Sequence, residues 1–326
     1  MHDVIYSAGY FVLELDGTLS GVLKEFEGGG VNAAVIEDLT APGPYVKKHI
    51  GRPNYEDLVL ELGFSMSREL YDWIEASWAR KYVRKSGAIA LCDPNMDART
   101  RHVFKDAVIA ETTLPACDAS SSDPAYLTLR LAPEYAHAEK ASGRVALFQS
   151  GRQKTWLRSN FRLQVDGLDC AWVSKVSPIT VKQRVVADPI GELREYVREP
   201  GRLDFSHIRV TLPEAHAESW VEWHNDFLIR GNCSQGREKH GTLEFLGANL
   251  QDPLMKVQLS NLGVYRLGYE RDAAGPQVRR VVVDLYCERM EIECAKSLGA
   301  AASESPGVAT LDVGARAAVT WPPQRV

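Results

Sequence analysis

Apolar side chains alternate with other residues over Phe11–Leu15, and the same alternation returns over Phe161–Val165, 150 positions later. Alternation with a period of two predicts a strand that buries one face. An Asp-Gly pair follows each segment, and glycine permits the positive φ that a tight turn requires. Each half of the chain is therefore predicted to begin with a strand and a turn.

The same offset aligns Leu58–Leu62 with Ile208–Leu212 as a second predicted strand. After each strand the apolar spacing changes to three and four, which predicts a helix with one buried face. The residues of these two faces are Leu70, Trp73, Ser77 and Trp78, and then Trp220, Trp223, Phe227 and Leu228. We expect Trp73 and Trp223 to hold the helices to their sheets.

Each half therefore predicts a strand, a long connection, a strand and a helix, followed by further strands. The long connections run from Gly17 to Gly51 and from Gly167 to Gly201. The further strands are Gly87–Leu91, Phe104–Thr112 and Tyr126–Leu131, matched by Gly241–Phe245, Val257–Tyr269 and Val281–Cys287. This order is typical of antiparallel sheets covered by one helix.

The predicted fold class is mainly β with one helix per domain, in two tandem antiparallel β-sandwich or barrel domains. Their predicted bounds are residues 1–140 and 152–295, joined by Glu139–Gly151. Residues 296–326 are rich in Ala, Ser, Gly and Pro, and we predict a flexible C-terminal tail.

Composition restricts the function classes. The chain has 326 residues, 45% of them hydrophobic and 25% charged, which is typical of a soluble globular protein. A net charge of −5 argues against whole-surface attraction to phosphate backbones or anionic lipid. No apolar run approaches the ~20 residues of a bilayer span, and we expect no signal peptide or membrane anchor. The six cysteines form no C-x-x-C pair, so we expect reduced thiols and cytoplasmic synthesis.

Several residues invite a chemical interpretation that their spacing does not favour. His216, His224, Cys233 and His240 match no standard zinc pattern. Gly28–Gly30 lacks the following Gly-Lys-Ser/Thr of a phosphate loop. The tryptophans could form a stacking platform for bases or sugars, but helical spacing favours packing against a sheet. We predict no catalytic, cofactor-binding or metal-binding residue.

The first half also resembles a known family through six segments that occur in a characteristic order. They are Phe11–Gly17, Gly28–Gly30, Tyr45–Arg52, Tyr55–Gly63, Leu70–Ile74 and Arg84–Leu91. Over roughly residues 8–137 the chain resembles the tail tube proteins of contractile phage tails and related injection machines. The resemblance implies a structural role with no catalytic centre and no cofactor.

In that family, subunits join edge to edge so that their sheets close into a ring, and the rings stack into a tube. Ring closure satisfies the backbone groups that an isolated small sheet leaves unpaired along its edges. We therefore expect each domain to complete its β-structure only with strands from adjacent molecules. The long connections are expected to reach the neighbouring subunit or the next ring.

The predicted subunit interface lies at Val46–Tyr55 and Tyr196–Phe205, with two basic residues nearby. Its residues are Val46, Lys47, Lys48, Ile50, Gly51, Arg52, Tyr55, Lys182, Arg184, Tyr196, Gly201, Arg202 and Phe205. Residues 20–40 carry a net charge of −3 and residues 170–190 one of +2. Opposite signs in equivalent segments favour alternating contacts between first and second halves around a ring.

The predicted function is a structural component of a contractile phage tail or phage-tail-like injection particle. The chain would form a ring at the baseplate end of the inner tube, as a hub or tube-initiating adaptor. Two domains per chain suggest a trimer with six similar domains in one layer, or a hexamer with two stacked layers.

The expected partners are further copies of the chain, the tail tube protein, and spike, hub and baseplate proteins. Nucleic acid is expected only as cargo in the lumen, and no membrane partner is expected. Two alternatives stay open. One is a repeating inner tube subunit, and the other is a two-domain β-rich binding protein or hydrolase with an interdomain cleft.

Overall fold

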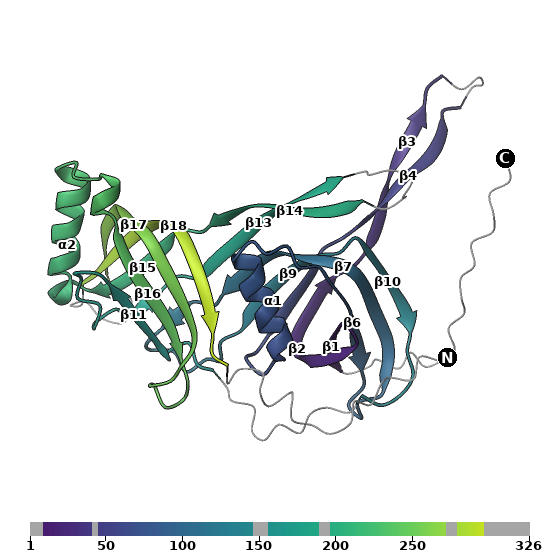
Figure 1. Cartoon of the computed structure of the whole chain (residues 1–326), viewed down its shortest axis with the longest axis horizontal. Coiled ribbons are helices and arrows are strands. Elements are labelled where there is room, and N and C mark those ends of the chain that lie inside the picture. Colours follow the sequence, from purple (N-terminus) through teal and green to yellow (C-terminus); the bar gives the residue numbers. More distant parts are fainter. Residues whose placement is uncertain (1–8, 41–44, 146–155, 189–195, 272–278, 297–326) are drawn as a thin grey trace.

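The computed structural model describes residues 9–40, 45–145, 156–188, 196–271 and 279–296. Figure 1 shows a mainly β molecule with two curved sheets side by side, helices α1 and α2, and two hairpins that extend beyond the sheets. The mainly β fold class predicted from the sequence is confirmed. Most of the predicted tail, and residues 146–151 of the predicted linker, lie outside the described residues.

The first sheet closes on itself as an antiparallel barrel. Its strands follow the order β1 (Tyr10–Leu15), β2 (Thr18–Gly28), β5 (Leu58–Leu62), β9 (Leu127–Ala132), β7 (Ala98–Leu114) and β6 (Lys85–Cys92), and β6 returns to β1. Strand β10 (Tyr135–Lys140) continues from β9 along β7. The prediction that this sheet closes only with strands from adjacent molecules is wrong, because β7 is long enough to pair with both β6 and β9 within the chain.

The second sheet repeats this strand order but is open at one seam. It runs β11 (Phe161–Val165), β16 (Lys239–Leu246), β17 (Pro253–Arg271), β18 (Arg279–Cys294), β15 (Ile208–Pro213) and β12 (Lys175–Val176). Between β11 and β12 lies a segment of the first half. There β12 pairs with β8 (Cys117–Asp118), and the Ala125 amide donates to the Trp156 carbonyl.

The two sheets agree in register as well as in order. On β6 and β7, Lys85 pairs with Ala107 and Gly87 with Phe104, with a bulge between the two pairs. On β16 and β17, Lys239 pairs with Leu262 and Gly241 with Leu259, again with a bulge between them. Positions on β16 and β17 therefore correspond to those on β6 and β7 with offsets of 154 and 155 residues.

The two predicted long connections consist largely of strands. The first contains β2 and then a separate hairpin of β3 (Val31–Asp38) and β4 (Lys47–Tyr55). The second contains β12 and a hairpin of β13 (Ile179–Asp188) and β14 (Val197–Phe205). The Asp-Gly turns are present as predicted, with φ of +83° at Gly17 and +70° at Gly167.

Two α-helices occupy the predicted places. Helix α1 (Arg68–Trp78) begins at Ser67, whose hydroxyl accepts from the Leu70 amide. Helix α2 (Glu218–His224) continues into a π-helical turn, Asn225–Ile229. Leu228 is 46% exposed, so its predicted place on the buried face is wrong. Leu228 directly follows Phe227, which is 4% exposed, and adjacent helical residues do not share a face. Two short 3-10 turns, Glu214–His216 and Gln235–Arg237, flank this region.

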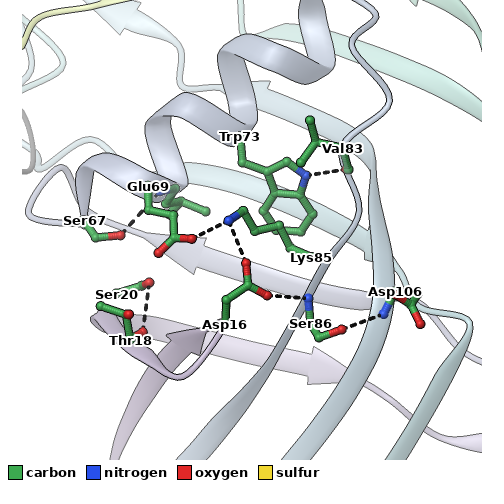
Figure 2. Close-up of polar contacts among 11 residues, drawn as sticks. Asp16, Thr18, Ser20, Ser67, Glu69, Trp73, Val83, Lys85, Ser86 and Asp106 are labelled. Carbon is green, nitrogen blue, oxygen red and sulfur yellow. Dashed lines mark hydrogen bonds and ion pairs between the residues drawn. The ribbon is translucent and has the colours of Figure 1, made fainter.

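A polar cluster ties α1 to the first Asp-Gly turn, as Figure 2 shows. The Lys85 ammonium lies 2.7 Å from the Asp16 carboxylate and also contacts Glu69 of α1. The Ser86 amide donates to the other Asp16 oxygen. One lysine and one aspartate therefore link the helix, the first hairpin turn and β6.

The two barrels share one buried apolar cluster. The Trp156 ring lies edge-on between Phe64, at 4.2 Å between ring centroids, and Phe245, at 4.7 Å. Helix α1 also bonds to the second barrel, since the Cys294 amide donates to Glu75 and Arg68 donates to the Cys294 carbonyl. The relative placement of the two barrels is therefore fixed by packing and hydrogen bonds.

Removing the Trp73 side chain should destabilise the protein strongly. Its ring is 2% exposed and its indole N–H donates to the Val83 carbonyl at 2.9 Å. We expect Trp73→Ala to lower the free energy of unfolding by about 3–5 kcal/mol, measured by urea titration. Trp172→Ala is the control, because that ring is half exposed. Equal losses in both variants would contradict the anchoring role of Trp73.

Candidate assembly interface

The β3–β4 hairpin extends from the first barrel as a two-stranded ribbon (Figure 1). Its exposed apolar side chains occur on both strands and near the turn: Val31, Val35, Ile36, Leu39, Tyr45, Val46 and Ile50. Such a ribbon is at best marginally stable in water by itself, and several large exposed apolar side chains on one hairpin are typical of an interaction surface. The hairpin is therefore the first component of the candidate interface.

The β13–β14 hairpin has the same construction but is docked within the chain. Residues Ile179–Lys182 of β13 pair antiparallel with Leu114–Glu111 of β7, which makes β13 the next strand of the first sheet. The Thr113 and Thr180 hydroxyls lie 3.0 Å apart across this junction. Strands from the two halves thus form one continuous sheet.

The far part of the docked hairpin is fixed by hydrogen bonds to the first domain. The Arg198 amide donates to the Glu134 carboxylate, and the Arg198 guanidinium donates to the Tyr55 carbonyl at 3.0 Å. Arg84 in turn donates to the Arg198 carbonyl. Hydrogen bonds that involve charged groups are stronger than neutral ones, so this end is held firmly.

A shallow groove of about 770 Å³ lies between the docked hairpin and the first barrel, lined mainly by charged side chains. Arg130 lies between Asp57 and Glu111, at 4.0 and 3.9 Å. Burial raises the pKa of Asp57, and the nearby Arg198 and Arg130 oppose that shift. Acidic and basic side chains of the two domains therefore lie together in this groove, which is typical of a polar contact surface.

The equivalent edge of the second barrel carries the same kind of ion pair with the charges exchanged. Glu111 on β7 pairs with Arg130 on β9, whereas Arg266 on β17 lies 3.0 Å from Asp284 on β18. Arg209 holds the same carboxylate at 2.7 Å and, with Arg266, lowers the pKa of Asp284. In the described residues, no strand pairs with the other side of β17 at Arg266–Tyr269.

The predicted interface residues lie on or beside the two hairpins and differ in their exposure to solvent. Val46, Lys47, Lys48 and Ile50 are exposed on or beside β4, and Lys182, Arg184 and Arg202 are exposed on the docked hairpin. Gly51, Arg52, Tyr196, Gly201 and Phe205 are half-buried, and the Arg52 guanidinium lies 5.9 Å from the Tyr196 ring centroid within the chain. Tyr55 is buried against Tyr135, so its side chain offers no free surface.

Two of the predicted basic interface residues lie at the contact between the two domains within one chain. Lys182 lies 3.7 Å from Glu111 across the intrachain junction, and its side chain stays largely exposed. Arg184 lines the groove between the hairpin and the barrel. Glu111 lies outside the acidic segment 20–40, so the expected contact between that segment and residues 170–190 stays a prediction.

No catalytic or metal arrangement was predicted from the sequence. Within the part of the chain that the structure describes, no three His, Cys, Asp or Glu side chains are grouped so as to hold a metal ion. His216 instead stacks on Trp172 at 4.1 Å between ring centroids. No helix among these residues is both long enough and apolar enough to span a bilayer.

Residues 7–137 match the family model described as T4-like virus tail tube protein gp19, which covers 131 of the 326 residues. The predicted resemblance to tail tube proteins is confirmed. The match includes the first barrel and the β3–β4 hairpin and ends before the second barrel. We therefore refer to residues 7–137 as the tail-tube-like domain. No curated protein matches the chain in sequence.

Three solved structures resemble the chain at low identity. One is an extracellular contractile injection system, the PVC sheath–tube complex in the extended state, with 19% identity, a TM-score of 0.37, and coverage of 43% of this chain and 94% of that chain. Another is the anti-feeding prophage cap, with 20% identity, a TM-score of 0.38, and coverage of 43% and 95%. A third is the sixfold-symmetrised anti-feeding prophage baseplate, with 15% identity, a TM-score of 0.34, and coverage of 42% and 92%.

Sequence reasoning missed the junction between β7 of the tail-tube-like domain and β13. A signal was present, since Ile179, Val181 and Gln183 alternate with Thr180, Lys182 and Arg184, which is typical of a strand with one buried face. The partner strand was not readable, because alternation gives the buried face of a strand and not its neighbour.

Neutralising Asp284 should weaken the protein at neutral pH and less so in acid. The ion pairs of Asp284 lower its pKa in the folded state. They therefore stabilise the fold fully above the unfolded-state pKa of ~3.9, and this stabilisation is lost as the pH falls through the folded-state pKa. We expect Asp284→Asn to cost about 1–2 kcal/mol at pH 7. Urea unfolding at pH 7 and pH 3 measures this, with the exposed Asp188→Asn as control. A cost that does not shrink in acid would contradict the assignment.

Proposed function

We propose that this protein is a non-enzymatic structural component of a contractile phage tail or phage-tail-like injection particle. The family match of residues 7–137 supports a tail tube role. The repeated strand order and register support two copies of one module per chain, with bounds near residues 1–140 and 152–295. Its proposed partners are further copies of itself, the tail tube protein, and spike, hub and baseplate proteins.

The single observation that carries the ring proposal is the β7–β13 junction. It joins the two domains through one continuous sheet, so they lie side by side (Figure 1). Because the two domains lie side by side, a trimer with six similar domains in one layer is favoured over a hexamer with two stacked layers. A layer of this kind suits the baseplate end of an inner tube, where it would serve as a hub or tube-initiating adaptor.

The rival within the same class is a repeating inner tube subunit. A repeating subunit presents faces that bind the next ring without limit, whereas an adaptor stops at one layer because its two faces meet different proteins. The open, charge-lined groove gives no specific support to a hydrolase, since a ligand site is usually an enclosed and mostly apolar pocket.

Mass measurement and negative-stain imaging of the purified chain test this proposal. We expect a ring-shaped trimer of about 109 kDa, three times 36.2 kDa, that does not lengthen into cylinders. The measurement is made at low and high salt, because charged contacts weaken with ionic strength. A strict monomer at all concentrations would overturn the ring, and long cylinders would favour the repeating subunit.

The free hairpin should be required for assembly and not for folding. Ile50 is 74% exposed on β4, so Ile50→Asp should leave the melting temperature within a few degrees of wild type, as surface substitutions usually do. We expect the trimer to dissociate at concentrations where wild type is assembled, because a charge would enter an apolar contact. Leu250→Asp is the matched control, since Leu250 is exposed in a turn of the second domain. Equal loss of assembly in both variants would remove the special role of the hairpin.

A further inference from the structure

Each chain has one hairpin that pairs with a neighbouring sheet and one that does not, although the base of the second hairpin contacts Arg198 through Asn54 and Tyr55. The β13–β14 hairpin of the second domain lies on the β7 edge of the first domain, and β3–β4 of the first domain pairs with no other described strand. The matching edge of the second domain, on β17, is also unpaired on that side among the described residues. One chain therefore offers one free donor hairpin and one free acceptor edge.

The two hairpins agree residue by residue. Val31 pairs with Tyr55 and Asp38 with Lys47, while Val181 pairs with Phe205 and Asp188 with Val197, each 150 positions later. Both ladders shift register at the same place, after Ala33 in one and after Gln183 in the other. The backbone at the base agrees too, since the Glu56 amide donates to the Gly30 carbonyl and the Ser206 amide to the Thr180 carbonyl.

The two acceptor edges agree in the same way. On β7, Ile109 pairs with Leu131 and, after a bulge, Glu111 pairs with Arg130. On β17, Val264 pairs with Leu285 and, after a bulge, Arg266 pairs with Asp284. The edge Glu111–Leu114, which receives β13, therefore corresponds to Arg266–Tyr269.

Burial differs at these equivalent positions as docking requires. Val181 is 3% exposed in the docked hairpin, whereas Val31 is 54% exposed in the free one. On the acceptor side Leu114 is fully buried, whereas Tyr269 is 52% exposed. Apolar side chains that are buried at the β7–β13 junction thus have exposed counterparts on the β3–β4 hairpin and on β17. This exposure favours a second copy of the chain as the partner.

We propose that residues 29–32 of one chain pair antiparallel with residues 266–269 of a second copy of the chain. By correspondence with the β7–β13 ladder, Asn32 lies opposite Arg266 and Val31 opposite Leu267. This inference rests on the proposed ring and specifies its contacts. Each junction is heterologous, and in the proposed ring of three chains every domain would both donate and receive one hairpin.

Charge at the hairpin's far end suits the same pairing. Within the chain, the Arg198 amide on β14 meets Glu134, which follows β9. The corresponding residues are Lys48 on the free hairpin and Glu288 on β18, and both are exposed. The proposed junction between chains would allow the Lys48 amide to donate to the Glu288 carboxylate, as the Arg198 amide does to Glu134 within the chain.

Disulfide trapping tests the register, with a background in which exposed Cys233 is replaced by serine. We expect Asn32→Cys with Arg266→Cys to give covalent dimers and trimers on a non-reducing gel that disappear on reduction. Glu111→Cys with Lys182→Cys is the internal reference, and it should lose free thiols without gaining mass. Asn32→Cys with Glu270→Cys is the off-register control, because four residues along a strand are ~13 Å.

We expect the in-register pair to cross-link at least about tenfold more than the off-register pair, because disulfides do not form beyond ~7 Å between Cα atoms. Trimers without this cross-link, while the internal reference oxidises, overturn the pairing and leave the ring proposal standing. A chain that is monomeric at every concentration and forms no cross-link overturns both. Equal cross-linking of both interchain pairs overturns the register.

Discussion

The ladder between β7 and β13 is the contact on which the rest of the architecture depends. It places a strand of the second half beside a strand of the first, and backbone hydrogen bonds fix both direction and register there. Buried side chains reinforce it, since Trp156 packs between aromatic rings of the two barrels. A chain joined in this way cannot rotate one domain about the other without breaking sheet hydrogen bonds.

That rigidity has a structural consequence for assembly. When two similar domains are held at a fixed relative placement, the same placement repeated between chains would generate a closed ring if its rotation closes and an open helical assembly if it does not. The first barrel is closed within the chain, so assembly need not complete it. In the proposed ring, a neighbour would cover the β3–β4 hairpin, whose apolar side chains are exposed in one copy of the chain.

The second barrel differs from the first at one seam. In the tail-tube-like domain, β1 and β2 pair directly, whereas at the equivalent seam β12 pairs with β8 from the first half. The exchange of charge between the pairs Glu111–Arg130 and Arg266–Asp284 marks the two acceptor edges as different. Such a difference allows each edge to favour one hairpin over the other.

The sequence by itself determined the local elements and their repetition. Alternation placed strands at Leu58–Leu62 and Ile208–Leu212, and helical spacing placed Trp73 and Trp223 on buried faces, because these patterns depend on short-range geometry. Tertiary structure alone decided that the first sheet closes within the chain and that β13 joins β7. It also left Leu228 exposed next to the buried Phe227. The pattern of apolar residues in a strand indicates which face is buried. It does not indicate which distant segment pairs with each edge of the strand, because that depends on how the whole chain packs.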